Sequence, residues 1–280
     1  MPRRPNHLGD GVWQFQTSLW ETNAVLVETG GATILCDPSW TAEEIAAIRE
    51  RATGTGKPLH VLITHSDFDH TCGIGFFPDA VVTAGAETAA AIAAGRAAEG
   101  LASAGAAWGL SWPLELRVDR TVEPGSWFAC DGSDVFAIEA RGHVGDGLAY
   151  FLREPGVLLP GDYLSPMTYP FVLSSLADAI ATSNRLLEVI AEHRPRWVIP
   201  GHGRPLGHEE ANEIGTADLA YLELLAAAAA DAKDRGLSSG DALVAVYGVE
   251  PPRTTTDDFD LYGLRTINAR TALAEKGSPR

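Results

Sequence analysis

Apolar positions in the first two thirds of the chain fall into short runs that alternate with turn residues. Residues 23–29 (NAVLVET) and 32–37 (ATILCD) flank Gly30-Gly31, a pattern typical of two strands joined by a hairpin. The run 59–65 (LHVLITH) is dominated by apolar residues, as expected of a buried strand. The same pattern predicts further strands at 12–20, 80–85, 115–119, 127–132, 134–143, 148–154, 156–162 and 197–202.

Helical spacing of apolar residues marks three segments between these strands and most of the remaining chain. Thr41, with Glu44 three positions later, forms a capping box that opens a helix ending near Gly54. Further helices are predicted at 86–101, at 173–193 and in most of the chain from 208 onward. Two strand-rich blocks followed by helices predict two packed sheets with helices on their outer faces. We therefore expect a core domain at 1–207 and a helical extension packed on it at 208–280.

Composition and charge narrow the function classes. The chain has 280 residues, of which 45% are hydrophobic, as in ordinary globular proteins. Its 21 Lys+Arg against 37 Asp+Glu give a net charge of −16, which would repel nucleic-acid phosphates. The first residues contain no apolar signal segment, and no run approaches the roughly 18 residues of a membrane span. We expect a cytoplasmic protein without a nucleic-acid or membrane partner.

The cysteines do not indicate a disulfide framework or a zinc site of the CxxC type. Cys36, Cys72 and Cys130 are too few and too scattered for either. Each is expected to pack as a small buried hydrophobe. Cys72 follows the histidine-rich stretch described next, so an alternative is that its thiol faces a cavity there.

Metal-ligand residue types gather where predicted strands end. The stretch 65–70 (HSDFDH) follows a buried strand and contains two histidines and two aspartates. Three later strands also end in such a residue, each directly after a glycine, which permits a sharp turn. Strand ends at one edge of a sheet can converge on one point. The residues concerned are His65, Asp67, Asp69, His70, His143, Asp162 and His202.

Each of these residues also has an ordinary explanation when taken alone. A single histidine after a strand is usually a solvated or hydrogen-bonded loop residue. An aspartate after glycine is common in turns, and Asp67 could equally be the N-cap of a following helix. The ordered set is harder to explain by folding alone, so a shared site is favoured.

The order HxDxDH, GH, GD and GHG resembles the metallo-β-lactamase-fold hydrolase superfamily, in its glyoxalase II-like and lactonase-like branch. The similarity runs from about residue 12 to 205. It implies an α/β (α+β) fold: a four-layer αββα sandwich of two mixed sheets. The usual first motif of that superfamily is HxHxDH, so this chain has Asp67 where a histidine is usual.

The resemblance further implies a dinuclear metal centre that hydrolyses a small-molecule ester, thioester, lactone or amide. One ion would be held by His65, Asp67 and His143, and the other by Asp69, His70 and His202, with Asp162 bridging them. Ions roughly 3.5 to 4 Å apart can share a hydroxide, which would be the nucleophile. Asp69 would also be catalytic, orienting this hydroxide and moving its proton.

The metal identity and the chemistry leave alternatives open. Imidazole and carboxylate ligands favour Zn²⁺, but the additional carboxylate of Asp67 suits iron or manganese better than a histidine would. If the carboxylate of Asp67 does not bind the first ion, that site is weak and the chain is a single-metal enzyme. An iron-dependent, dioxygenase-like oxidoreductase and a non-catalytic scaffold are the competing hypotheses. Asp162 stands where antibiotic-degrading branches that bind zinc through sulfur have a cysteine, which argues against a secreted β-lactamase.

Substrate contacts are less defined by the sequence. Aromatic residues in predicted loops could line an apolar pocket or donate a hydrogen bond, although each could instead pack on the core. Asp146 is a candidate for fixing the tautomer of a metal-bound histidine, with a simple turn as the alternative. His208 is expected to head the next helix. The partner is expected to be a small molecule, with a homodimer left open. The aromatic candidates are Trp20, Trp108, Trp112, Tyr163 and Tyr169.

Overall fold

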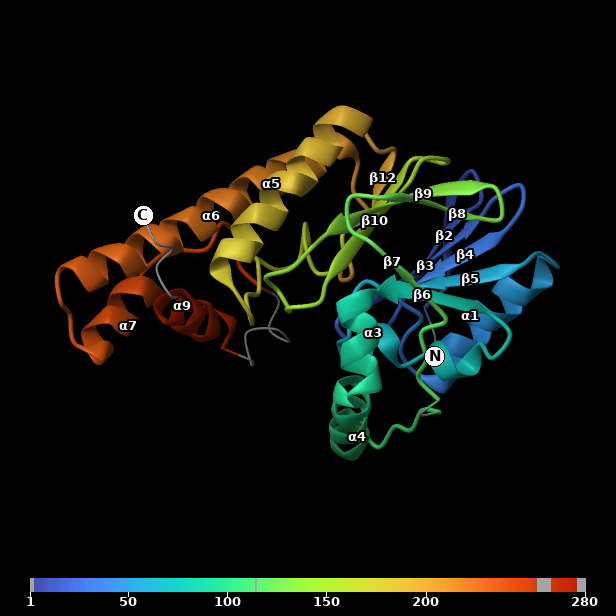
Figure 1. Cartoon of the computed structure of the whole chain (residues 1–280), viewed down its shortest axis with the longest axis horizontal. Helices are drawn as coiled ribbons and strands as arrows, with labels where there is room; N and C mark the ends of the chain where they lie inside the picture. Colours follow the sequence, from blue (N-terminus) through green and yellow to red (C-terminus); the bar gives the residue numbers. More distant parts are fainter. Residues whose placement is uncertain (1–2, 114, 256–262, 276–280) are drawn as a thin grey trace.

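Two β-sheets pack face to face between layers of helices in the computed structural model, which describes residues 3–113, 115–255 and 263–275 (Figure 1). The arrangement confirms the predicted αββα sandwich with helices at its C-terminal end. Each sheet mixes parallel and antiparallel pairs. In the described chain, no helix is both long and apolar enough to cross a bilayer.

The first sheet has seven strands in sequence order. Its first four strands are antiparallel and its last four are parallel, with one strand shared between the two sets. In chain order they are β1 (Asn6–Gly9), β2 (Val12–Gln16), β3 (Asn23–Glu28), β4 (Thr33–Cys36), β5 (Leu59–Leu62), β6 (Val81–Gly85) and β7 (Arg120–Val122).

The second sheet has five strands in the order β12-β11-β10-β9-β8. Its strands are antiparallel except for the pair β11–β12, which is parallel. They are β8 (Trp127–Cys130), β9 (Ser133–Glu139), β10 (Leu148–Leu152), β11 (Val157–Leu159) and β12 (Trp197–Val198).

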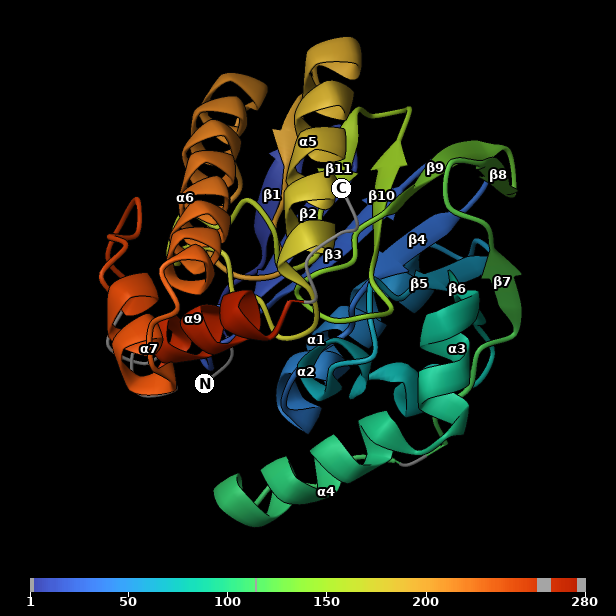
Figure 2. The same ribbon diagram turned by 60° about the vertical axis from the view of Figure 1, so that its left-hand side comes forward.

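Alternation of side chains along the strands divides the interior into layers. Leu26 and Leu35 face α1, whereas Val25 and Val27 face the other sheet and pack with residues such as Tyr150. On the far side, α5 and α6 lie next to each other over the second sheet (Figure 2). The helices and short helical turns are α1 (Ala42–Gly54), α2 (Phe68–Thr71), η1 (Ile74–Phe76), α3 (Ala86–Ala93), α4 (Arg96–Trp108), α5 (Leu176–His193), α6 (His208–Asp234), α7 (Ser239–Tyr247) and α9 (Leu264–Ala274).

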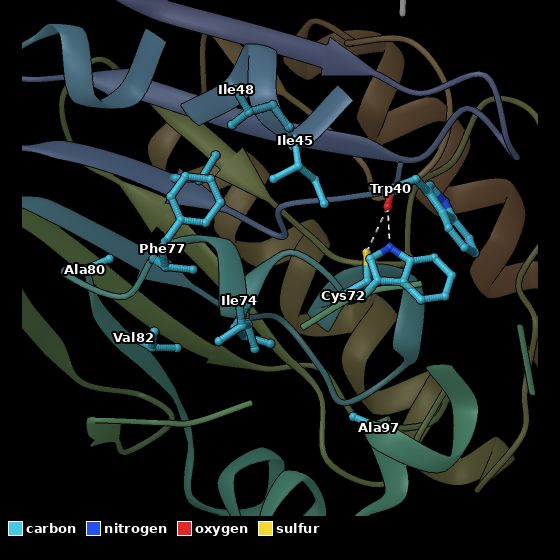
Figure 3. Packing of buried hydrophobic residues seen from close by; sticks show 14 of the residues in the cluster. Trp40, Ile45, Ile48, Cys72, Ile74, Phe77, Ala80, Val82 and Ala97 are labelled. Carbon is cyan, nitrogen blue, oxygen red and sulfur yellow. Dashed lines mark hydrogen bonds between the residues drawn. The ribbon is translucent and has the colours of Figure 1, made fainter. Parts of the chain in front are cut away.

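Cys72 lies in the hydrophobic core packed against the first sheet (Figure 3). This cysteine is fully buried, and its Sγ lies 3.9 Å from the carbonyl oxygen of Trp40. Ile45 and Ile48 of α1 and Ile74 belong to the same cluster. The packing interpretation of Cys72 is therefore the one the structure supports. Cys36 and Cys130 are also buried and free.

The capping box at Thr41 and Glu44 is present as predicted, with Thr41 accepting from the Glu44 backbone and Glu44 accepting in return. The single helix predicted at 86–101 was wrong. The chain forms two helices, because Gly95 adopts a left-handed φ of 87° between α3 and α4. As a result Trp108 ends a helix and does not lie in a loop.

Predicted strands were mostly too long or slightly displaced. The segment 115–119 is not a strand where the structure describes it, and β7 begins just after it at Arg120. Strand β1, at the edge of the first sheet, was not predicted. His208 does head a helix, α6. The proposed division between 207 and 208 stays a prediction.

Candidate metal centre

Strand ends from both sheets bring the seven predicted ligand residues together. Those from 65 to 70 follow β5, and the others lie in the loops after β9, β11 and β12. Four histidines and three aspartates from across 138 sequence positions, 65 to 202, thus share one edge of the sandwich. All four histidines are at least 95% buried.

A first group consists of His65, Asp67 and His143. Oδ2 of Asp67 lies 3.3 Å from Nε2 of His143 and 3.6 Å from Nε2 of His65. Asp67 occupies the N-cap position of α2, but its side chain makes no capping hydrogen bond. The carboxylate is directed to the histidines instead, so the capping explanation for Asp67 does not hold.

A second group consists of Asp69, His70 and His202. Oδ2 of Asp69 lies 3.4 Å from Nε2 of His70 and 3.4 Å from Nε2 of His202. The potential ligand atoms in each group lie within 4.8 Å of one another. The two groups share no residue, and each could surround one cation.

Asp162 lies between the two groups. Its Oδ1 is 3.1 Å from Nε2 of His70, and its Oδ2 is 3.2 Å from Nε2 of His143 and 3.4 Å from Nε2 of His202. One carboxylate therefore reaches histidines of both groups. This is the placement that a bridging ligand requires.

Every histidine is held through its other ring nitrogen. Nδ1 of His143 lies 2.8 Å from the Phe171 carbonyl, and Nδ1 of His202 lies 2.9 Å from the Trp20 carbonyl. Because a carbonyl oxygen can only accept, each Nδ1 must carry the proton. In the neutral imidazole, the form that binds a metal, Nε2 is then left as a lone-pair donor directed at the other ligands.

Asp37 supports the remaining two histidines, His70 directly and His65 through Thr64. It was not among the site residues predicted from the sequence. Its Oδ2 accepts from Nδ1 of His70 at 3.0 Å and from Oγ1 of Thr64 at 2.7 Å. Thr64 Oγ1 in turn lies 2.9 Å from Nδ1 of His65. Asp37 also ends a strand run, ATILCD, so the strand-end rule that identified Asp162 applied equally to it.

The unpartnered atoms in the site fit a bound cation. Nε2 of His65, His70 and His143 and Oδ1 of Asp162 are buried and make no hydrogen bond with any described residue. Buried acceptors without a partner are costly, and here they converge. Imidazole nitrogens and carboxylate oxygens are the ligands that divalent transition metals take, so the residues present fit such ions.

Charges within the site shift several pKa values strongly. Burial opposes ionisation of Asp162, but His202, His70 and His143 outweigh it and hold the Asp162 pKa well below its ordinary range. Burial likewise opposes a charge on His143, yet Asp162 and Asp67 raise its pKa to about 9. The carboxylate of Asp162 is thus ionised and attracts positive charge, whether from protons or from metal ions.

Glycine at position 201 is required by close packing beneath the ligands. A Cβ there would collide with Oδ1 of Asp162 and come within 2.8 Å of Cε1 of His70. The glycine before His202 therefore makes room for two other ligand residues. At Gly142 and Gly161 the backbone has a positive φ of 115° and 60°, as expected of a sharp turn before a ligand.

The two predicted substrate tyrosines lie beneath the loop and away from open space. The Tyr163 hydroxyl donates to the Arg141 carbonyl at 2.5 Å and accepts from the His143 backbone N–H at 3.0 Å. Its donor is thereby committed, and burial raises the pKa of the phenol. Tyr169 is 4% exposed and packs edge-on against Tyr221 of α6. For both, the packing alternative fits better than substrate contact.

Aromatic residues form a cluster that includes Trp20, whose backbone carbonyl lies 2.9 Å from Nδ1 of His202. The Trp20 ring lies 5.3 Å from that of Trp108 and 6.0 Å from that of Phe68, which sits between Asp67 and Asp69 in the chain. Trp20 is partly exposed, whereas Trp112 is 9% exposed and donates to the Trp40 carbonyl. Trp20 is therefore better placed than Trp112 for the predicted contact with substrate.

Asp146 does not fix a histidine tautomer. Its carbonyl accepts from Thr88 Oγ1 at 2.6 Å, and its buried carboxylate oxygens have no partner among the described residues. The role predicted for it belongs to Asp37.

Comparison with known proteins agrees with this geometry. A family model described as the metallo-beta-lactamase superfamily matches residues 18–202. An atrochrysone carboxyl ACP thioesterase from Cryptosporiopsis sp. (strain 8999) is 25% identical over 207 residues, or 72% of this chain and 54% of that protein. The chain thus spans about half the length of this curated relative.

Solved structures share the fold. The inverting sec-alkylsulfatase Pisa1 from Pseudomonas sp. is similar over 96% of this chain and 49% of its own, with a TM-score of 0.73 and 14% identity. A metallo-beta-lactamase from Pontibacter korlensis is similar over 79% of this chain and 98% of its own, with a TM-score of 0.56 and 17% identity. Because the family model matches residues 18–202, which is well over half of the chain, the chain belongs to the metallo-beta-lactamase superfamily.

Proposed function

We propose that the chain is a dinuclear metal-dependent hydrolase, with zinc as its preferred metal, that cleaves an acyl bond of a small molecule. The observation that supports this most is the position of Asp162. Its two oxygens lie 3.1 to 3.4 Å from Nε2 atoms of both histidine groups. A site for one ion would not need a carboxylate shared in this way.

Charge balance also supports two ions. Three carboxylates of the proposed ligand set lie around the same histidines: Asp67 and Asp162 at 3.3 and 3.2 Å from Nε2 of His143, and Asp69 and Asp162 at 3.4 and 3.1 Å from Nε2 of His70. Without cations their mutual repulsion would be large in a buried site. Two divalent ions would offset these three charges and leave one positive charge for a nucleophilic hydroxide.

Residues of the chain would position the attacking water and shield it from bulk solvent. When bound, the metal ions supply a water molecule of lowered pKa and polarise the scissile carbonyl. Asp69 lies 3.4 Å from two histidines of the second group and is the carboxylate proposed to orient the water and take its proton. The rings of Trp20 and Phe68 lie 6.0 Å apart, and we propose that they shield the reacting atoms from bulk water, because the Trp20 carbonyl holds His202 and Phe68 precedes Asp69 in the chain.

Among ester, thioester, lactone and amide, we place thioester first. The support is the name of the curated relative, which is a thioesterase. The excess of acidic residues in this chain supports a small acyl substrate over a nucleic acid.

Metal analysis combined with a substrate panel tests the proposal. Protein purified without added metal should contain close to two equivalents of zinc per chain. It should hydrolyse an acyl thioester of N-acetylcysteamine, with activity lost to 1,10-phenanthroline and restored by Zn²⁺. Activity that persists in metal-free protein would overturn the proposal. Bound iron with visible absorption and oxygen consumption would favour the oxidoreductase alternative, for which the carboxylate of Asp67 is the supporting observation.

A further inference from the structure

The loop formed by residues 163–172 connects the candidate metal centre to the C-terminal helices. It begins directly after Asp162 and contains no helix or strand. On its inner side, the Phe171 carbonyl accepts from Nδ1 of His143 at 2.8 Å. Ser165 Oγ donates to the carbonyl of His202 at 2.9 Å. The course of this loop therefore affects how two proposed ligands are held.

A single side chain from α9 brackets Phe171 from the outer side. Oδ1 of Asn268 accepts from the backbone N–H of Val172 at 2.9 Å, and its Nδ2 donates to the carbonyl of Pro170 at 2.7 Å. Asn268 is only 1% exposed, so these bonds face no competition from solvent. The backbone groups on either side of Phe171 are thus fixed by one buried amide.

Arg253 fixes the same loop at Thr168, two residues before Pro170. Its Nε donates to the carbonyl of Thr168 at 2.8 Å. The guanidinium is held in turn by Asp218 of α6 through two bonds of 2.7 and 3.0 Å. A bidentate arginine–carboxylate pair has a defined geometry, so it holds the Thr168 carbonyl at a defined position.

These contacts form a continuous connection from helices α6 and α9 to the ligand imidazole. Irregular backbone has no ladder of its own to fix it, and a shift of the Phe171 carbonyl would rotate the ring of His143. We infer that Asn268 and Arg253 are positioning residues of the metal centre, which act by holding the loop whose Phe171 carbonyl orients His143. The inference rests on the proposed metal site and gives the C-terminal helices a role in building it.

Substitution of Asn268 by alanine tests the inference through metal binding. Partners that hold a metal-bound histidine typically contribute about 10- to 100-fold to metal affinity. We expect Asn268→Ala to weaken binding of the more loosely held zinc ion by about 10-fold in a chelator competition. The visible absorption spectrum of the Co²⁺-loaded variant should also change, because the ligand field at His143 is altered. Arg253→Lys loses the bidentate pair with Asp218 but keeps the positive charge, so it should weaken zinc binding less than Asn268→Ala does.

Two control variants separate positioning from a general loss of stability. Arg265, also on α9, binds the Tyr247 carbonyl and Glu250 and, within the described part of the chain, makes no hydrogen bond or ion pair with the 163–172 loop. Arg265→Ala should therefore loosen the helical part without changing zinc affinity or the Co²⁺ spectrum. Among the residues that the structure describes, the Asn184 side chain of α5 bonds only within its helix, to the Ile180 carbonyl. Asn184→Ala should therefore match the wild type in both zinc affinity and Co²⁺ spectrum.

The outcomes distinguish this inference from the proposed function. Wild-type protein that binds no metal refutes both. Wild-type protein that binds zinc, with Asn268→Ala binding it equally well, refutes the inference alone, as does an equal loss in Arg265→Ala. If Asn268→Ala does not fold, Arg253→Lys takes its place. That change removes the hydrogen bond to the Thr168 carbonyl, and unchanged zinc affinity and Co²⁺ spectrum in it would likewise refute the inference.

Discussion

Oδ2 of Asp37 lies 3.0 Å from Nδ1 of His70, while Nε2 of the same ring lies 3.1 Å from Oδ1 of Asp162. The imidazole thus spans two carboxylates, one that fixes its tautomer and one that shares its proposed metal. Through Thr64, Asp37 also supports His65, which belongs to the other group. A single buried carboxylate therefore supports one histidine at each of the two proposed metal positions.

Asp37→Asn should weaken metal binding without removing any ligand. Both oxygens of Asp37 accept hydrogen bonds, so the amide group would place a donor against the donor of Thr64 or His70. We expect a loss of about 10- to 100-fold in zinc affinity, measured by competition with a chelator. Both proposed metal positions should be affected.

A matched control for this change is Asp131→Asn. Asp131 also pairs with a histidine, His60, at 2.8 Å, but neither belongs to the metal centre. Its zinc affinity should equal that of the wild type. Equal affinity in Asp37→Asn and wild type would show that Asp37 has no part in metal binding.

Substitutions of Asp67 should report on metal preference. Asp67→His restores the histidine that is usual in the superfamily and replaces a hard oxygen ligand by nitrogen, which should increase the preference for zinc over manganese. Asp67→Ala should reduce the metal content by about one equivalent per chain, because His65 and His143 alone would hold the ion weakly. Parallel titrations with Zn²⁺ and Mn²⁺ measure both effects. An unchanged metal content in Asp67→Ala would exclude Asp67 from the ligand set.

Gly201→Ala should damage the site by steric displacement alone. The new methyl group would collide with Asp162 and press on His70, both proposed ligands. Hydrolytic activity and zinc content should fall together, while the far-ultraviolet circular dichroism should stay close to that of the wild type. Gly207→Ala is the matched control, because a Cβ at that position meets nothing within 4 Å. Full activity in Gly201→Ala would contradict the described packing beneath the ligands.

The parts of the fold that were predicted correctly depend on local sequence. Thr41 and Glu44 lie three positions apart and form their capping box within one helix turn. The proposed ligand residues were recognised because each ends or closely follows a predicted strand, which is also a local signal. The helix break at Gly95 was missed because an isolated glycine in an alanine-rich segment does not by itself show which backbone conformation packing will select.

Contacts between distant segments explain the rest. Asp37 precedes its partner His70 by 33 positions, and no spacing rule connects them. Asn268 reaches Pro170 and Val172 across 98 and 96 positions and lies in a helix with no motif. Tyr163 and Tyr169 were candidates for substrate contact because they follow Asp162, with packing as the alternative, and the loop turns their rings into the protein. Sequence patterns identified which residues meet at the site, and packing between the helices and the sheets decided what supports them.

The metal-free protein should lose stability as the pH rises, and the zinc-loaded protein should not. Although burial disfavours its charge, Asp162 and Asp67 raise the pKa of His143 from 6.5 to about 9 in the folded chain. The stabilisation by protonated His143 is complete below about pH 6.5 and is lost as the pH rises through about 9. This amounts to at most about 3 kcal/mol in the free energy of unfolding.

Zinc reverses this dependence, because it takes the place of the proton on Nε2. Zinc affinity should therefore increase between pH 7 and about 9, as protons compete less. Urea unfolding with and without Zn²⁺ across this range measures both effects. In His143→Ala the decline of the metal-free protein should be smaller but not absent, since His70 and His202, whose pKa values neighbouring aspartates also raise against the effect of burial, remain. Parallel pH curves for the metal-free and zinc-loaded wild type would mean that zinc does not displace a proton from His143.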